Sequence, residues 1–182
     1  MEALDGIDCR PLSGAELTLV GEIDRTEQID ALYVQRGTRL ELRHGDFSAP
    51  PWRRDGTGEH SISAQLAAVD AYVAAGGVAL GAFDGDRLVG IGVVLTHVRP
   101  SFSQLAYLQV SNGCRRIGIG TRLAEELEQI ARASGDRSMV VSATPSLNTV
   151  RFYERRGFRP TADPLPELFE LEPEDVHMEK AL

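Results

Sequence analysis

Residues 105–133 read LAYLQVSNGCRRIGIGTRLAEELEQIARA, and the rest of the chain is best interpreted outward from this stretch. Its mostly apolar start predicts a buried strand, and residues 121–134 carry apolar side chains at helical spacing. Between them lies RRIGIG, in which Arg115 and Arg116 supply planar donors that suit phosphate oxygens. A helix start offers free N–H groups and a positive dipole end, and glycine lets the backbone approach an anion closely. The stretch therefore predicts a strand, a phosphate-binding turn and a helix.

The chain on either side predicts a mixed α/β (α+β) domain whose sheet is mostly antiparallel. Two apolar runs are joined by Asp84, Gly85 and Asp86, and an Asp-Gly turn between such runs is a strong hairpin signal. The run SMVVS lacks polar alternation, which is typical of a strand covered on both faces. The strands expected here are residues 78–83, 87–96, 102–110, 138–142, 158–161 and 176–181. The helices expected are residues 61–75, 121–134 and one from Ser146 or Asn148 to Arg156.

The first 60 residues give weaker patterns. Residues 7–12 predict a strand, and Ser13 followed by Glu16 predicts a capped helix start. Residues 38–43 alternate like a short strand, and residues 44–60 have the Gly, Pro, Ser and Asp content of a loop. The only tryptophan lies in that loop, where we interpret it as an anchor rather than as a lid.

Residues 21–30, GEIDRTEQID, are rich in carboxylates. Ile29, Leu32 and Tyr33 are spaced like a helical turn, so the acidic segment is interpreted as a solvated helix face. The alternative is the wall of a site that attracts a cationic amine. The pattern leaves both interpretations open.

Length and composition restrict the class of protein. The 182 residues predict one domain, residues 1–182, and the net charge of −8 argues against general nucleic-acid binding. Cys9 and Cys114 lie far apart, so neither a disulfide framework nor a metal site is expected. No apolar run approaches the length of a membrane span, and the acidic start is unlike a signal peptide. We therefore expect a cytoplasmic protein without a membrane partner.

Two common phosphate-binding loops do not fit RRIGIG. A Walker loop needs Gly-Lys-Ser/Thr, which is absent from the sequence. A dinucleotide-binding fingerprint needs a third glycine where Leu123 stands, and it needs a βαβ unit rather than an antiparallel meander before it.

A third loop does fit, because RRIGIG resembles the Arg/Gln-x-x-Gly-x-Gly/Ala pyrophosphate loop of the GNAT superfamily of N-acetyltransferases. The later segment NTVRFYERRGF is similar to that family's late-helix motif, and HMEKAL to its last strand. The resemblance is strong over residues 78–182. In the residues before 78 it rests only on the order of the expected helices and strands. The sequence departs from the common pattern at Arg116, where many members have Gly, at Asn112, where many have Pro, and at Val150, where Ala is commonest.

The resemblance implies acetyl-CoA as acyl donor and a sheet with parallel central strands that splay apart. The pyrophosphate would meet the backbone of residues 116–121, and pantetheine would pair with the strand near residues 108–110. A backbone N–H there, taken as that of Leu108, would stabilise the oxyanion. The cofactor-binding residues that the resemblance implies are Leu108, Gln109, Val110, Arg115, Arg116, Ile117, Gly118, Ile119, Gly120, Thr121 and Asn148.

By the same resemblance, Tyr153 is the acid that protonates the leaving thiolate after direct attack by an amine. On a helical wheel Tyr153 faces inward, which also suits a core aromatic. Asn148 either supports pantetheine or caps its helix. The general base stays open, because no carboxylate precedes the loop. Its candidates are Glu22, Asp24, Glu27, His97 and a water chain.

The sequence therefore predicts an N-acetyltransferase that acts on a primary amine of a small molecule such as an antibiotic, a polyamine or an amino acid. The alternatives are acetylation of a protein N-terminus or lysine, and a non-catalytic acyl-CoA-binding module. Family members are often dimers, so a homodimer is an assembly that the resemblance allows.

Overall fold

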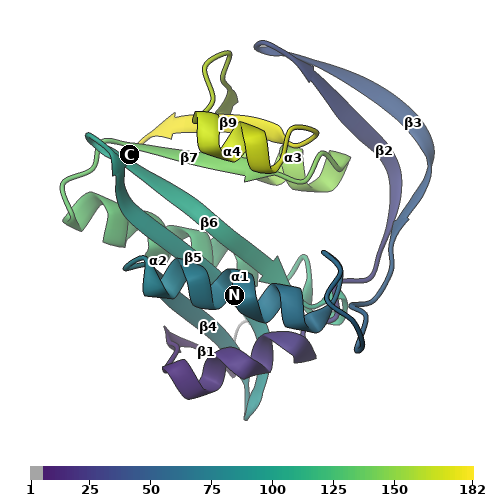
Figure 1. The fold of residues 1–182 in the computed structure, drawn as a ribbon, viewed down its shortest axis with the longest axis vertical. Coiled ribbons are helices and arrows are strands. Elements are labelled where there is room, and N and C mark those ends of the chain that lie inside the picture. Colours follow the sequence, from purple (N-terminus) through teal and green to yellow (C-terminus); the bar gives the residue numbers. More distant parts are fainter. Residues whose placement is uncertain (1–5) are drawn as a thin grey trace.

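Seven strands form the central sheet of the computed structural model, which describes residues 6–182 (Figure 1). Their order across the sheet is β1-β4-β5-β6-β7-β9-β8, and β2 and β3 form a separate two-stranded arm. The strands are β1 (Ile7–Pro11), β2 (Glu27–Arg36), β3 (Arg39–Ala49), β4 (Val78–Asp84), β5 (Arg87–Arg99), β6 (Phe102–Val110), β7 (Ser138–Ala143), β8 (Arg159–Pro160) and β9 (Val176–Ala181). The α-helices are α1 (Ile62–Ala74), α2 (Ile119–Ala133), α3 (Leu147–Arg155) and α4 (Pro166–Leu171), and η2 (Gly14–Glu22) and η3 (Asn112–Cys114) are 3-10 helices.

The pairing of β6 with β7 is the only parallel one among the described strands, so the expected mixed, mostly antiparallel sheet is confirmed. These two strands pair over just three positions, from Phe102 with Ser138 to Gln104 with Val140. Strand β6 then continues to Val110 beside β5 alone. The sheet is therefore open between the C-terminal ends of its two central strands.

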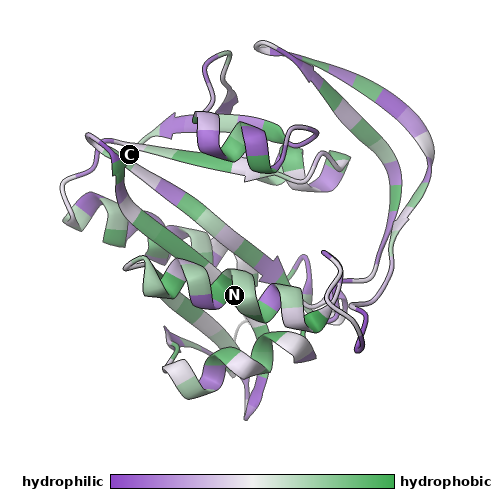
Figure 2. Cartoon of the chain, viewed as in Figure 1, coloured by the Kyte–Doolittle hydropathy of each residue, from purple (hydrophilic) through white to green (hydrophobic). Residues whose placement is uncertain are grey.

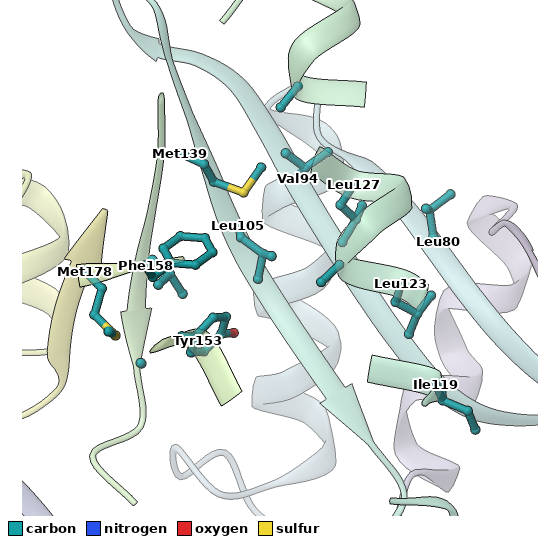
Figure 3. Packing of buried hydrophobic residues seen from close by; sticks show 14 of the residues in the cluster. Leu80, Val94, Leu105, Ile119, Leu123, Leu127, Met139, Tyr153, Phe158 and Met178 are labelled. Carbon is teal, nitrogen blue, oxygen red and sulfur yellow. The ribbon is translucent and has the colours of Figure 1, made fainter. Parts of the chain in front are cut away.

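Hydrophobic residues lie along the strands of the central sheet (Figure 2), and buried clusters form on both of its faces, since neighbouring residues such as Leu88 and Val89 of β5 belong to different clusters. Helices α2 and α3 pack on one face, where Leu123, Leu127 and Tyr153 join the largest cluster (Figure 3). Segments η2 and α1 cover β4 and β5 on the other face, and α4 covers β7 there. Helix α2 packs closely on β5 at Gly92, where a Cβ atom would lie only 2.6 Å from the Leu127 side chain. Glycine at this position therefore permits the close approach.

The helix expected around Ile29, Leu32 and Tyr33 is wrong, because these residues belong to strand β2. A β-bulge between Ile29 and Ala31 shifts the register, and both residues are buried. The bulge breaks the alternation of period two that marks a strand, so the apolar spacing imitates a helical turn. The interpretation of residues 21–30 as one helix face fails with it.

The arm also extends further than expected. Strand β3 runs on to Ala49, so the loop begins at Pro50 rather than at His44. The loop is anchored as predicted, since the Arg25 guanidinium lies 4.2 Å from the centroid of the Trp52 ring.

The other expected elements are present, with ends that differ by a few residues. Ser13 and Glu16 form the predicted capping box, although the helix that follows is a 3-10 helix. Helix α2 begins two residues earlier than expected, at Ile119. Within residues 6–182, no helix is both long and apolar enough to cross a membrane.

A buried carboxylate holds α2 to the end of the chain. Glu128 is only 3% exposed, and its oxygens accept from Arg156 Nη2 at 2.7 Å and from Lys180 Nζ at 2.8 Å. Burial by itself would raise the pKa of Glu128, but the hydrogen bonds from Lys180 and Arg156 outweigh it and hold that pKa below its ordinary value. These three residues, Glu128, Arg156 and Lys180, therefore join α2 to the end of α3 and to β9.

We expect Glu128→Gln to lower the free energy of unfolding by about 3 kcal/mol, because it removes the buried carboxylate charge that two largely buried cations share. Glu126→Gln, which removes one half-exposed pair with Arg122, should cost only about 0.3–0.5 kcal/mol. Urea denaturation measures both. Since the pKa of Glu128 is depressed, its contribution is complete above about pH 4.5 and is lost as the pH falls through the folded-state value. Equal effects of the two substitutions at pH 7 would contradict this account.

Candidate functional site

The start of α2 presents backbone N–H groups that no described residue uses. Gly118 is the N-cap with φ +106°, and it supplies no side-chain cap. Within residues 6–182, no acceptor is bonded to the N–H groups of Ile119, Gly120 and Thr121. Arg116 has φ +65°, a left-handed conformation that glycine adopts more readily than arginine. The loop therefore has the geometry of an anion site at a helix N-terminus.

A groove of about 450 Å³ borders this helix start, and we call it the donor groove. It lies between α2 and α3 and is lined by Thr121, Glu125, Phe152, Arg155 and Arg156. Of the expected cofactor residues, Thr121 lines it directly. The exposed Arg155 adds positive charge at its edge.

The Arg115 side chain points to the arm rather than to the loop. Its Nη1 donates to Glu27 Oε2 at 3.0 Å, and its Nε donates to the Val110 carbonyl at 3.0 Å. Further bonds reach the carbonyls of Arg25 and Thr26. The Arg115 side chain thus makes four hydrogen bonds to the end of β6 and to residues 25–27 at the start of the arm. In this orientation it does not point to the phosphate-binding loop, where it was expected from the sequence.

Glu27 connects the arm to two predicted site residues. Its Oε1 accepts from Asn148 Nδ2 at 3.0 Å, while Oε2 accepts from Arg115. The alternative in which Asn148 caps its helix is wrong, because Ser146 is the N-cap and its Oγ accepts from Thr149 N at 3.2 Å. Glu27 and Asn148 face one another where β6 and β7 have parted.

Among the strands of residues 6–182, none neighbours the edge of β6 away from β5 beyond Gln104. Leu108, Gln109 and Val110 lie on this stretch, opposite Gly92, Ile91 and Gly90 of β5. An extended ligand can therefore lie along β6 without breaking a described strand pair.

Tyr153 is buried, as predicted, at 5% exposure on the inner face of α3. Its ring meets Phe152 and Phe158 edge to face, with centroids 5.1 Å and 5.4 Å away. Its hydroxyl points toward β6 (Figure 3). Burial raises the pKa of the phenol, and the negative charge of Asp175 raises it further. The phenol therefore keeps its proton at neutral pH.

The base candidates fall at different places. His97 lies at the far end of the sheet, where its backbone N–H donates to the buried Asp136 at 2.9 Å, and Asp136 also accepts from Ser103. From Ser103 to Leu108 the strand rises by about 17 Å, so His97 is remote from the open edge of β6. Hydrogen bonds from Thr26 lower the pKa of Asp24, which makes it a weak base.

Sequence reasoning missed Asp175, which directly precedes β9. Its Oδ2 accepts from Ser142 Oγ at 3.4 Å, at the C-terminal end of β7. Burial raises the pKa of Asp175 to about 7, and the charges of Glu172 and Glu59 add to the effect, against the hydrogen bond from Ser142. The only signal in the sequence was an acidic residue before the last strand, within a segment that is acidic throughout.

Comparison with known proteins places the chain in a family. Residues 56–182 match the family model described as an acetyltransferase (GNAT) domain. No curated protein matches the chain.

Solved structures match over nearly the whole chain. The structure of nourseothricin acetyltransferase is similar with a TM-score of 0.69 and 16% identity, covering 97% of this chain and 98% of that one. A putative streptothricin acetyltransferase from Bacillus anthracis str. Ames, in complex with acetyl coenzyme A, has a TM-score of 0.63, 15% identity and coverage of 97% and 96%. The PaiA N-acetyltransferase from Thermoplasma acidophilum, in complex with coenzyme A, has a TM-score of 0.63, 17% identity and coverage of 97% and 99%. At these identities the likeness is one of fold.

We expect Arg115→Lys to lower the free energy of unfolding by about 1–3 kcal/mol, because one ammonium cannot reproduce the several bonds of the guanidinium. Arg116→Lys, on the exposed neighbour, should change it by less than about 0.5 kcal/mol. Chemical denaturation measures both, and faster amide exchange at the start of β2 should accompany the first. An Arg115→Lys protein as stable as the Arg116→Lys protein would show that these bonds contribute nothing.

Proposed function

This chain belongs to the GNAT family of acetyltransferases, and on that basis we propose that it transfers the acetyl group of acetyl-CoA to a primary amine of a small molecule. The observation that carries the proposal is the convergence of three features at one place in the sheet. They are the free N–H groups at the start of α2, the open edge of β6 and the buried Tyr153 phenol.

The donor half of the proposal assigns each part of the cofactor to a described surface. Its pyrophosphate binds the N–H groups of residues 116–121, where the dipole of α2 favours negative charge. The adenosine portion occupies the donor groove, and the exposed Arg155 provides charge for its phosphate. Pantetheine lies along β6 from Leu108 to Val110. Asn148 reaches the same gap, and its amide is free to bond pantetheine when Glu27 releases it.

The chemistry that we propose is direct attack by a neutral amine on the thioester carbonyl. A backbone N–H near Leu108 stabilises the oxyanion, and Tyr153 protonates the departing thiolate. The raised pKa of Tyr153 supports this role, because only a protonated phenol can act as the acid. A small-molecule acceptor is supported by the fold that the chain shares with the antibiotic acetyltransferases described above.

Gly120→Ala should weaken acetyl-CoA binding at least tenfold without destabilising the protein. A Cβ there meets Val110 and Phe152 at no less than 3.6 Å, so the fold accommodates it, and alanine is the better helix former. The same methyl group occupies the approach to the helix start. Calorimetric titration with acetyl-CoA and thermal melts of the free protein measure the two effects. Gly113→Ala, whose Cβ meets nothing within 4 Å, is the control and should bind normally.

If wild-type protein shows no thermal shift with acetyl-CoA, the donor assignment is wrong. Normal binding by Gly120→Ala would contradict the location of the pyrophosphate.

Tyr153→Phe should lower kcat by about 10²-fold or more while leaving the affinity for acetyl-CoA unchanged, because it removes only the acidic proton. Thiol release with an amine substrate measures the rate. Tyr72→Phe is the matched control, since Tyr72 is a half-buried phenol on α1 whose pKa burial also raises. Full turnover by Tyr153→Phe would exclude the acid role.

A further inference from the structure

A pocket lies between the arm and the connection from β8 to β9, and we call it the arm pocket. Its volume of about 390 Å³ falls within the range of small-molecule sites, roughly 300–1,000 Å³. Tyr33 of β2 and Phe169 of α4 contribute aromatic rings to it, and Asp175 contributes a carboxylate. Among the described residues no lysine or arginine lines it. Its chemistry is therefore that of a site for a cation with apolar parts.

Specific bonds fix the walls of the arm pocket. The Gln35 amide donates to the carbonyls of Thr161 at 2.9 Å and His177 at 3.2 Å, and its oxygen accepts from His177 N at 2.7 Å. Near the base of the arm, Tyr33 N donates to the Pro145 carbonyl at 2.7 Å. These bonds tie β2 to the ends of β7 and β9, so the pocket is built from two parts of the chain more than 100 residues apart in sequence.

Asp175 connects the arm pocket to the proposed reaction centre. It lines the pocket, it accepts from Ser142 at the end of β7, and its charge acts on the buried Tyr153. We propose that the arm pocket binds the acceptor as a small cationic amine and that the Asp175 carboxylate takes the proton that the amine must lose. This inference rests on the proposed function, since it assigns the acceptor side of the same reaction.

The proton balance closes with the side chains of Asp175 and Tyr153 and with solvent water. The ammonium R–NH₃⁺ gives one proton to Asp175, and the lone pair of the amine forms the C–N bond as the C–S bond breaks. The thiolate takes the phenol proton of Tyr153, and the second N–H proton returns to the phenolate. Asp175 then releases its proton to water. The products are one amide, one thiol and one proton.

The titration of Asp175 supports the role, because burial and its neighbours bring its pKa to about 7, close to the pH at which a base works best. The ionisable groups around it come from every packed element. They are Glu172 after α4, Glu174 beside it, Glu59 before α1, Tyr153 on α3 and His177 on β9. Burial lowers the pKa of His177 below 6.5, so a rate change near pH 7 belongs to Asp175.

The test compares Asp175→Asn with wild type and with Glu170→Gln, which removes an exposed charge of α4 that does not line the pocket. The probes are nourseothricin, spermidine and L-lysine, followed by thiol release. For the amines that wild type accepts, Asp175→Asn should lower kcat/KM by about 10²-fold or more and remove the rise of kcat/KM near pH 7. Glu170→Gln should change kcat/KM less than about twofold and keep that rise. The affinity of all three proteins for acetyl-CoA should agree within twofold.

Stability separates a catalytic role from a structural one. Because the folded-state pKa of Asp175 is raised, its charge destabilises the fold progressively as the pH rises from about 4 to above 7. Asp175→Asn should therefore melt at the same temperature as wild type or higher at pH 8, while it loses activity. A lower Tm with unchanged kcat/KM would make Asp175 a structural residue and overturn the inference.

The outcomes also separate this inference from the proposed function. Failure to bind acetyl-CoA overturns the donor site and the function with it. Binding of acetyl-CoA without turnover of any of the three amines overturns the arm pocket alone. Turnover with an unchanged pH profile in Asp175→Asn overturns the base and leaves the enzyme assignment intact.

Discussion

The parting of β6 and β7 is the constraint on which the site depends. The two strands pair over only three positions, and β6 continues for six residues with a partner on one side. Unpaired backbone groups are costly when buried, so an edge of this kind is stable only if a ligand or water satisfies it. Every feature argued for the donor side is arranged around this opening: the loop at the start of α2 at one end and Tyr153 across from the strand.

The opening is maintained by contacts among residues far apart in the chain. Arg115 and Asn148 both bind Glu27, so one carboxylate links the loop after β6, the start of α3 and the arm. Further along α2, Glu128 links that helix to Arg156 and Lys180. Together the two clusters fix α2 and α3, the helices that border the donor groove, and a site ordered in advance lowers the entropic cost of binding for the cofactor that we propose.

Burial gives the two proposed proton carriers opposite tasks. It raises the pKa of both Tyr153 and Asp175, because each would carry a negative charge away from water. A phenol with a raised pKa stays protonated and can serve as an acid. A carboxyl group raised to about 7 is partly ionised at neutral pH and can serve as a base. Burial of the two groups therefore supports the acid role proposed for Tyr153 and the base role proposed for Asp175.

The elements that could be predicted from the amino-acid sequence are those whose signals are local. The meander from Val78 to Val110, the loop RRIGIG and helix α2 follow from periodicity and turn chemistry over a few residues, and the structure has them in those places. The inward direction of Tyr153 followed from helical spacing in the same way. Three features could be seen only in the folded chain: β2 is a strand with a bulge, Arg115 turns to the arm, and Asp175 lies beside Ser142. The physical reason is that these features depend on partners 33 to 88 residues away or on a broken strand register, and neither leaves a periodic trace in the sequence.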